Sequence, residues 1–160
     1  MKKLFPALLL ISVILVFTDC LSEKNSLFND SEWIMKNYDS QGKLYYHHLI
    51  LGMNHSAMLR ASYSDSSNII VWSGKYKINS KKIIFDFTEC VRYENGEIVG
   101  QYTSGKLIKY YSGEFFYSLA ELGEVENRQY HMELIRPKNY FYGENKDIFG
   151  NQMEEFIKVK

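Results

Sequence analysis

The stretch IIVWSGKYKINSKKIIFDFT, residues 69–88, determines the fold class of this chain. Apolar and polar side chains alternate along each of its halves, and the polar residues 79–81 separate the two halves. Successive side chains of a strand point to opposite faces, so each half presents one apolar face. The apolar positions are Ile70, Trp72, Tyr76, Ile78, Ile83, Phe85 and Phe87. The stretch therefore predicts two antiparallel strands joined by a turn, with one face buried.

Runs of the same kind occupy most of the sequence after residue 43. They are rich in tyrosine, phenylalanine and isoleucine, which favour strands, and turn residues separate them. Asn95-Gly96 is the strongest hairpin signal, because both residues tolerate positive φ. We expect further strands at residues 44–51, 57–63, 90–93, 97–103, 107–111, 114–119 and 128–135. About eight short antiparallel strands with hairpin-length links predict an all-β up-and-down barrel, with a sandwich as the alternative.

One or two short helices complete this expectation. The first covers residues 30–38, with Asn29, Asp30 or Ser31 as its N-terminal cap. The second lies near residues 146–156, and this segment could equally end in a last strand over residues 155–159.

The first 19 residues have the features of a secretory signal peptide. Met1-Lys2-Lys3 is basic, and residues 4–17 carry no charge. A membrane-spanning helix needs about 20 apolar residues, so this run is short for a permanent span, although an uncleaved anchor helix is the alternative. Removal of residues 1–19 leaves 141 of the 160 residues, and we expect residues 27–160 to form a single exported domain.

The charge of that domain is balanced. Residues 1–19 contain Lys2, Lys3 and Asp19, so 17 basic and 18 acidic residues remain of the 19 and 19 in the whole sequence. A net charge near −1 gives no general attraction for nucleic acid and indicates no polybasic patch for anionic lipid. We therefore expect no nucleic-acid partner.

Residues 15–20, Leu-Val-Phe-Thr-Asp-Cys, resemble the lipobox of bacterial lipoproteins. In that family a cysteine directly follows the apolar segment, becomes the new N-terminus after cleavage, and carries lipid. The resemblance implies a lipidated Cys20, a tether over residues 20–26, and attachment to a membrane of the cell envelope, the outer rather than the inner one. Asp19 stands where the family has a small residue and Phe17 where leucine or valine is usual. Cleavage by ordinary signal peptidase, which would release a soluble secreted protein, is therefore the alternative.

Residues 72–85 resemble the middle hairpin of lipocalin-like bacterial envelope proteins, in which a Gly-x-Tyr/Trp-x-Ile strand, a turn and an alternating apolar strand follow one another. The glycine-x-tryptophan motif of true lipocalins is absent, since no glycine stands two residues before Trp33. The resemblance implies an eight-stranded barrel.

Aromatic side chains are the most distinctive feature of the composition, with 13 tyrosines, 10 phenylalanines and 2 tryptophans. The interior of an eight-stranded barrel either is filled by side chains or holds one small ligand. Alternation places a set of aromatic residues inside, and these are our candidate ligand-lining residues: Trp72, Tyr76, Phe85, Tyr102 and Phe116.

The sequence indicates no catalytic site, metal site or cofactor. His47 and His48 point to opposite faces of one strand, whereas His47, His55 and His131 could approach one another. Glu89 is unusual, because continued alternation would turn it inward, where it would need a cationic partner such as Arg60 or Arg92. A strand that ends near Glu89 is the simpler interpretation.

These observations together lead us to expect a lipid-anchored envelope protein, not an enzyme, that binds a small hydrophobic ligand. The membrane, reached through the N-terminal lipid, is its expected partner, and no protein partner is indicated. One alternative is a ligand-free structural or protein-interaction module that acts through its surface. Others are a secreted protein without an anchor and an enzyme that uses Glu89 or clustered histidines.

Overall fold

The computed structural model describes residues 26–79, 81–124, 128–137, 148 and 155–160. The predicted leader (1–19) and all of the tether (20–26) except Ser26 lie outside these residues. No helix among the described residues is long and apolar enough to cross a membrane. The described residues form a helical turn at 26–28, the helix α2 (Lys106–Lys109), and the strands β1 (Ser31–Tyr38), β2 (Leu44–Leu51), β3 (Ser56–Tyr63), β4 (Asn68–Ile78), β5 (Lys82–Glu94), β6 (Glu97–Tyr102), β7 (Gly113–Leu122), β8 (Gln129–Ile135) and β9 (Phe156–Lys158).

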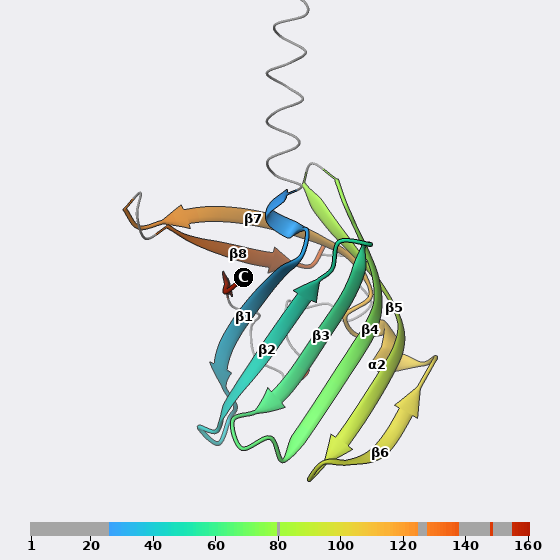
Figure 1. The fold of residues 1–160 in the computed structure, drawn as a ribbon. Helices are drawn as coiled ribbons and strands as arrows, with labels where there is room; N and C mark the ends of the chain where they lie inside the picture. The colour runs from blue at the N-terminus through green and yellow to red at the C-terminus, as the bar shows by residue number, and fades with distance from the viewer. Residues whose placement is uncertain (1–25, 80, 125–127, 138–147, 149–154) are drawn as a thin grey trace, which may run out of the picture.

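The strands close into an antiparallel barrel, which confirms the predicted all-β fold class. Their order is β4-β3-β2-β1-β9-β8-β7-β5, and the pairing of β4 with β5 completes a ring of eight strands (Figure 1). Most sheet neighbours are also neighbours along the chain, as in an up-and-down barrel. β6 lies outside the ring and pairs with the second half of β5, while β7 pairs with the first half of β5.

The short strand β9 completes the ring between the first strand and the eighth. Its Ile157 pairs with Ile34 of β1 on one side and with His131 of β8 on the other. The last strand expected over residues 155–159 is therefore confirmed. The helix proposed for residues 146–156 falls mostly outside the described residues.

A β-bulge in β5 changes which side chains point inward. Ser73 of β4 pairs with Glu89, whereas the next residue, Gly74, pairs with Phe87, so Thr88 is an extra residue on β5. A Cβ at position 74 would collide with the backbone of Asp86, which explains the glycine at this close approach.

The bulge reverses the alternation on which the interpretation of Glu89 depended. β5 continues to Glu94, so the expectation that the strand ends near Glu89 is wrong. Cys90 is fully buried opposite Trp72, while Glu89 lies on the outer face and accepts a hydrogen bond from Nε2 of Gln101 at 2.6 Å. An extra residue shifts all later side chains by one position, and the carboxylate therefore needs no buried cation.

The helix predicted for residues 30–38 is wrong, because this segment is β1. Its alternate residues Ser31, Trp33 and Met35 are buried, and the whole segment pairs with β2. Ser31 does not cap a helix. Its hydroxyl donates to the carbonyl oxygen of Phe28 at 2.8 Å and accepts from the indole Nε1 of Trp33 at 2.9 Å. Strand pairing and the burial of an indole ring outweigh a weak helical preference here.

The strand predicted for residues 107–111 is also wrong. This segment forms α2 and the turn after it, and it places Ile108 and Tyr111 in the interior. The indole Nε1 of Trp72 donates to the Leu107 carbonyl oxygen at 2.8 Å, and the rings of Trp72 and Tyr111 make an edge contact at 4.8 Å. Apolar residues suited to a strand are used here to fill the barrel.

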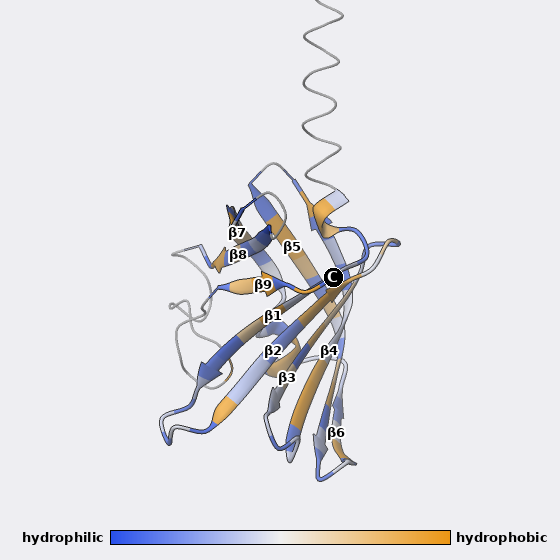
Figure 2. Ribbon diagram, turned by 60° about the vertical axis from the view of Figure 1, so that its left-hand side comes forward, coloured by the Kyte–Doolittle hydropathy of each residue, from blue (hydrophilic) through white to orange (hydrophobic). Residues whose placement is uncertain are grey.

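The core lies inside the ring and receives side chains from all of its strands. Apolar segments occur in β1, β2, β4, β5 and β9, which lie on different sides of the ring (Figure 2). Aromatic rings meet mostly edge to face, an arrangement that stabilises such pairs beyond the burial of their area. Among the described residues, every strand of the ring and every buried apolar residue of the core falls between residues 28 and 158.

Candidate functional site

The barrel interior is filled by the described side chains. A cavity among the core side chains has a volume of about 10 Å³ and is lined by Leu49, Leu59, Phe85, Phe87, Tyr111, Phe115, Leu134 and Phe156. A single water needs roughly 10–15 Å³, and pockets for small organic ligands measure roughly 300–1,000 Å³. As described, this cavity is therefore too small for an organic ligand.

Of the five candidate ligand-lining residues, three lie in the core. Trp72, Tyr76 and Phe85 are at most 4 % exposed, and Tyr102 is partly buried against the core. The inward position expected for Phe116 is wrong, because its ring is 40 % exposed and lies 5.2 Å from Nζ of Lys82. The error has a simple cause: a shift of one residue moves a side chain to the other face of a strand.

The residue next to Phe116 takes the inward position. Phe115 is 1 % exposed and pairs with Ile83, which is also buried. Paired residues in a sheet share a face. The pairing with β5 therefore decides which of the two phenylalanines is inside, and the sequence of β7 alone did not contain that information.

Two hollows outside the filled core are larger. One, of about 170 Å³, is lined by Asn29, His55, Tyr76 and Ile78 at the end of the barrel where the described chain begins. The other, of about 440 Å³, follows the seam around β9 and is lined by Ile34, Lys36, Gln129, Glu155, Ile157 and Val159. Of the five candidate ligand-lining residues, only Tyr76 lines the first of these hollows, and none lines the second.

The interior contains one buried polar pair. Nε2 of His47 lies 2.7 Å from the hydroxyl of Tyr111, and the backbone N–H of Ile148 donates to the same hydroxyl at 2.8 Å. Burial lowers the pKa of His47 to about 3, because a low-dielectric interior disfavours the charged imidazolium. A neutral His47 suits this position, since its Nε2 can accept a hydrogen bond from the Tyr111 hydroxyl.

The histidines do not converge on one point. His48 binds Glu32 through Nε2 at 3.0 Å on the outer face, and His55 contacts the Tyr76 ring in the β2–β3 turn. Nδ1 of His131 lies 2.7 Å from a carboxylate oxygen of Glu155. Among the described residues, no group of three histidine, cysteine or carboxylate side chains could hold a metal ion.

The outer face of strands β4, β5 and β6 carries neighbouring apolar side chains, and polar residues accompany them on β2 and β3. Because cross-strand partners share a face, pairing places one row of residues side by side: Tyr46, Ser62, Ile69, Tyr93 and Ile98. Ser62 is only 8 % exposed although it faces outward, which fits a small side chain between two large neighbours.

A second row lies beside the first: His48, Arg60, Val71, Val91 and Gln101. We call the apolar members of the two rows on β4, β5 and β6 the outer apolar face: Ile69, Val71, Val91, Tyr93 and Ile98. Ile98 is 62 % exposed, and the neighbouring bulge residue Val99 is 50 % exposed. Within the described chain β6 pairs with β5 alone, so the outer apolar face ends at an open sheet edge.

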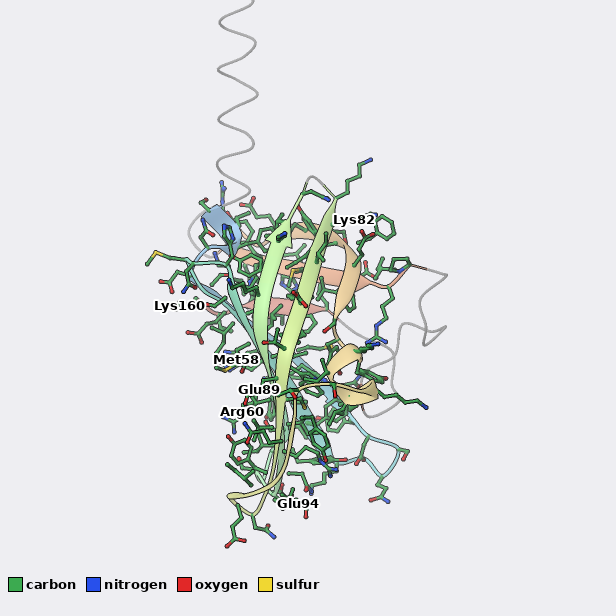
Figure 3. All side chains as sticks on the ribbon, turned by 90° about the vertical axis from the view of Figure 1, so that its right-hand side faces the viewer. Met58, Arg60, Lys82, Glu89, Glu94 and Lys160 are labelled. Atoms are coloured by element: carbon green, nitrogen blue, oxygen red, sulfur yellow. The ribbon has the colours of Figure 1, made fainter. Side chains whose placement is uncertain are left out.

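Arg60 provides a cation beside the outer apolar face. It pairs with His48 on one side and Val71 on the other, so no carboxylate stands directly opposite it. Its Nε is buried and has no hydrogen-bond partner among the described residues. Figure 3 shows Arg60, Met58 and Glu89 on this side of the sheet. An arginine next to apolar side chains is a recurrent feature of protein-binding surfaces.

Sequence reasoning missed this surface, although one signal was present. Residues 69–72 are four consecutive apolar residues, so the strand is apolar on both faces. A strand of a closed barrel buries only its inner face, and the second apolar face therefore needed its own explanation. Comparison with known proteins adds no relative, since no family model, curated protein or solved structure matches the chain.

Proposed function

We propose that this chain is a lipid-anchored protein of the cell envelope whose barrel is a packed scaffold and whose outer apolar face binds a protein partner. The observation that carries the proposal is the filled interior, which leaves a cavity of about 10 Å³ where a ligand-binding barrel needs space for an organic molecule. This packing favours the interaction module over the small hydrophobic ligand.

The chemistry of the outer apolar face indicates the kind of partner. Tyr93 and Ile98 offer apolar contact area, and Arg60, which stands opposite Val71 of the same face, offers a guanidinium with no carboxylate directly opposite it. A partner that presents a carboxylate between apolar side chains would satisfy both features. Charge-assisted hydrogen bonds between arginine and a carboxylate are stronger than hydrogen bonds between neutral groups, and they gain strength where water is excluded.

The anchor and this surface are compatible in space. The described chain begins at Ser26, at the end of the barrel that carries the β2–β3 and β4–β5 turns, and the tip of the β5–β6 hairpin lies at the opposite end (Figure 1). A lipid on Cys20 would leave the β5–β6 ribbon pointing away from the membrane. Multiple acyl chains would hold the protein firmly, at about 0.8 kcal/mol for each buried methylene.

Site-specific photo-crosslinking in the native cells tests the proposed surface. A photoreactive phenylalanine replaces Ile98 in one variant and Phe116, outside the face, in the control. We expect one discrete adduct from position 98 that Arg60→Gln reduces at least fivefold, and none of that mass from position 116. Identical adducts from both positions, or an adduct that persists in the Arg60→Gln variant, would contradict the proposal.

Two further measurements separate the anchor and the ligand from the surface. Cys20→Ser should move the protein from the membrane fraction to the soluble fraction, and unchanged retention would count against lipidation. Native mass spectrometry of the purified protein should give the mass of the chain with its lipid alone. An additional mass that is lost on unfolding would restore the ligand-binding alternative.

A further inference from the structure

The tip of the β4–β5 hairpin concentrates positive charge at one end of the barrel. Four lysines occur within eight residues, and no acidic residue lies between them. Lys75 and Lys77 are exposed on the outer face of β4, Lys81 is exposed in the turn, and Lys82 begins β5. Figure 3 labels Lys82 near the tip of the hairpin, where β5 begins.

Only part of this charge is compensated. Nζ of Lys82 lies 2.6 Å from a carboxylate oxygen of Glu114, and Lys75 stands opposite Asp86 in the register of β4 and β5. Lys77 pairs with Ile84, and within the described residues neither Lys77 nor Lys81 takes part in an ion pair. Two ammonium groups at the tip therefore remain available to a ligand.

The chain enters the barrel directly beside this hairpin. The hydroxyl of Tyr76, between Lys75 and Lys77, lies 3.4 Å from the carbonyl oxygen of Phe28 and 3.3 Å from Oδ1 of Asn29. Cys20 precedes Ser26 by six residues. Since an extended chain spans at most about 3.6 Å per residue, Cys20 lies within about 22 Å of Ser26.

We propose that the lysine hairpin, Lys75, Lys77, Lys81 and Lys82, binds the headgroups of anionic phospholipids and holds this end of the barrel against the membrane. The orientation rests on the proposed lipid anchor, which brings the hairpin within reach of the bilayer. Electrostatic attraction to an anionic surface acts within about 8 Å at physiological ionic strength, so the short distance is essential.

The opposite end of the barrel has the wrong charge for this role. Its turns carry Asp39 and Asp65, and the β5–β6 tip carries Glu94 and Glu97, against Lys43 and Arg92. Lys43 is paired with Asp65 at 2.9 Å, and Arg92 lies 3.4 Å from Glu94. The distribution of charge therefore favours contact through the lysine hairpin and keeps the acidic end in solution.

Vesicle binding by the chain from residue 21 onward tests the proposal without any contribution from a lipid on Cys20. The probes are phosphatidylcholine vesicles with and without phosphatidylglycerol, at low and high salt. We expect binding that requires phosphatidylglycerol and is lost at high salt. The double variant Lys77→Gln/Lys81→Gln should bind about twenty-five-fold more weakly, since each lysine near an anionic surface contributes about fivefold.

The matched control is Lys106→Gln/Lys109→Gln, which removes the same charge from exposed positions of α2. It should change binding less than threefold. Equal losses in both variants would mean a general charge effect and would overturn the assignment, as would equal binding to both vesicle types. Tighter binding to duplex DNA than to anionic vesicles would replace the lipid as the partner. None of these outcomes depends on Cys20. A negative result would therefore count against lipid binding by the lysine hairpin and not against lipidation of Cys20.

Discussion

The hydroxyl of Tyr111 lies 2.7 Å from Nε2 of His47 inside the barrel, where both side chains are at most 2 % exposed. His47 comes from the wall, on β2, and Tyr111 from the segment that fills the interior. The pair therefore links the filling segment to the wall by a polar contact as well as by packing. A polar contact of this kind is costly to disrupt, because groups left unpaired in an apolar interior lose their hydration without compensation.

Acid should destabilise the protein through His47. Burial lowers the pKa of His47 in the folded state to about 3, whereas the unfolded value is near 6.5. As the pH falls, His47 is therefore protonated in the unfolded chain before it is protonated in the folded protein. Its contribution to stability is fully present above pH 6.5 and is lost as the pH falls toward 3. We expect the free energy of unfolding, measured with urea, to fall by up to about 1.4 kcal/mol per pH unit in this interval from this group.

The His47→Gln variant should lose this contribution, so its unfolding free energy should depend less steeply on pH between 6.5 and 3. His48→Gln, on the outer face of the same strand, is the control and should retain the slope. If His47→Gln and the unchanged protein had the same slope, burial of a neutral His47 would be ruled out as the cause of acid sensitivity.

Removal of the Tyr111 hydroxyl should cost stability without removing the ring. Tyr111→Phe keeps the edge contact with Trp72 but leaves the Ile148 N–H and His47 Nε2 without this partner. We expect a loss of about 1–3 kcal/mol in the free energy of unfolding. Tyr93→Phe, on the outer apolar face, should change it by less than about 0.5 kcal/mol. Equal effects of the two variants would contradict the buried role of Tyr111.

Cys90 should be unreactive in the folded protein. It is fully buried, and desolvation is the main cause that raises the pKa of its thiol to about 12. Thiol reagents attack the thiolate, which is scarce at pH 8 for such a group. In the chain from residue 21 onward, labelling should be at least a hundredfold slower in buffer than in denaturant. Rapid labelling in buffer would show that β5 opens or that the bulge does not place Cys90 inside.

Gly74 should not tolerate a side chain. A Cβ at this position would collide with the carbonyl oxygen of Asp86 and the Cα of Phe87, which are backbone atoms and cannot move aside alone. We expect Gly74→Ala to lower the unfolding free energy by about 1–3 kcal/mol, as other overpacking substitutions do. Ser73→Ala, the matched neighbour, should have little effect. An unchanged melting temperature in Gly74→Ala would mean that the strands do not approach this closely.

Most strands could be predicted from the sequence because alternation is a local property. Residues 69–88 contain two alternating runs and a turn between them. The alternation alone indicates which face of each strand is buried, before any partner strand is known. The Asn95-Gly96 turn similarly specifies its own hairpin, and in the structure Asn95 and Gly96 both have positive φ. A pattern of this kind depends only on neighbours in the chain.

Errors arose where a partner strand or a distant segment decided the outcome. The extra residue Thr88 reverses the faces of Glu89 and Cys90, and its place follows from pairing with β4. Pairing with β5 places Phe115 inside and Phe116 outside. Residues 31–38 become a strand because β2 pairs with them along their length. Local preference is weak compared with these tertiary contacts.

The sequence by itself determined the fold class, the alternation of most strands and the expectation of a leader before Cys20. Only the tertiary structure decided that the interior is filled, because the volume inside a ring depends on side chains from every strand and on α2 at once. The lysines of residues 75–82 are neighbours in the sequence, but only the tertiary structure places them at one end of the barrel and the acidic turns at the other. A net charge near −1 does not indicate this separation, because it is a sum that contains no positions.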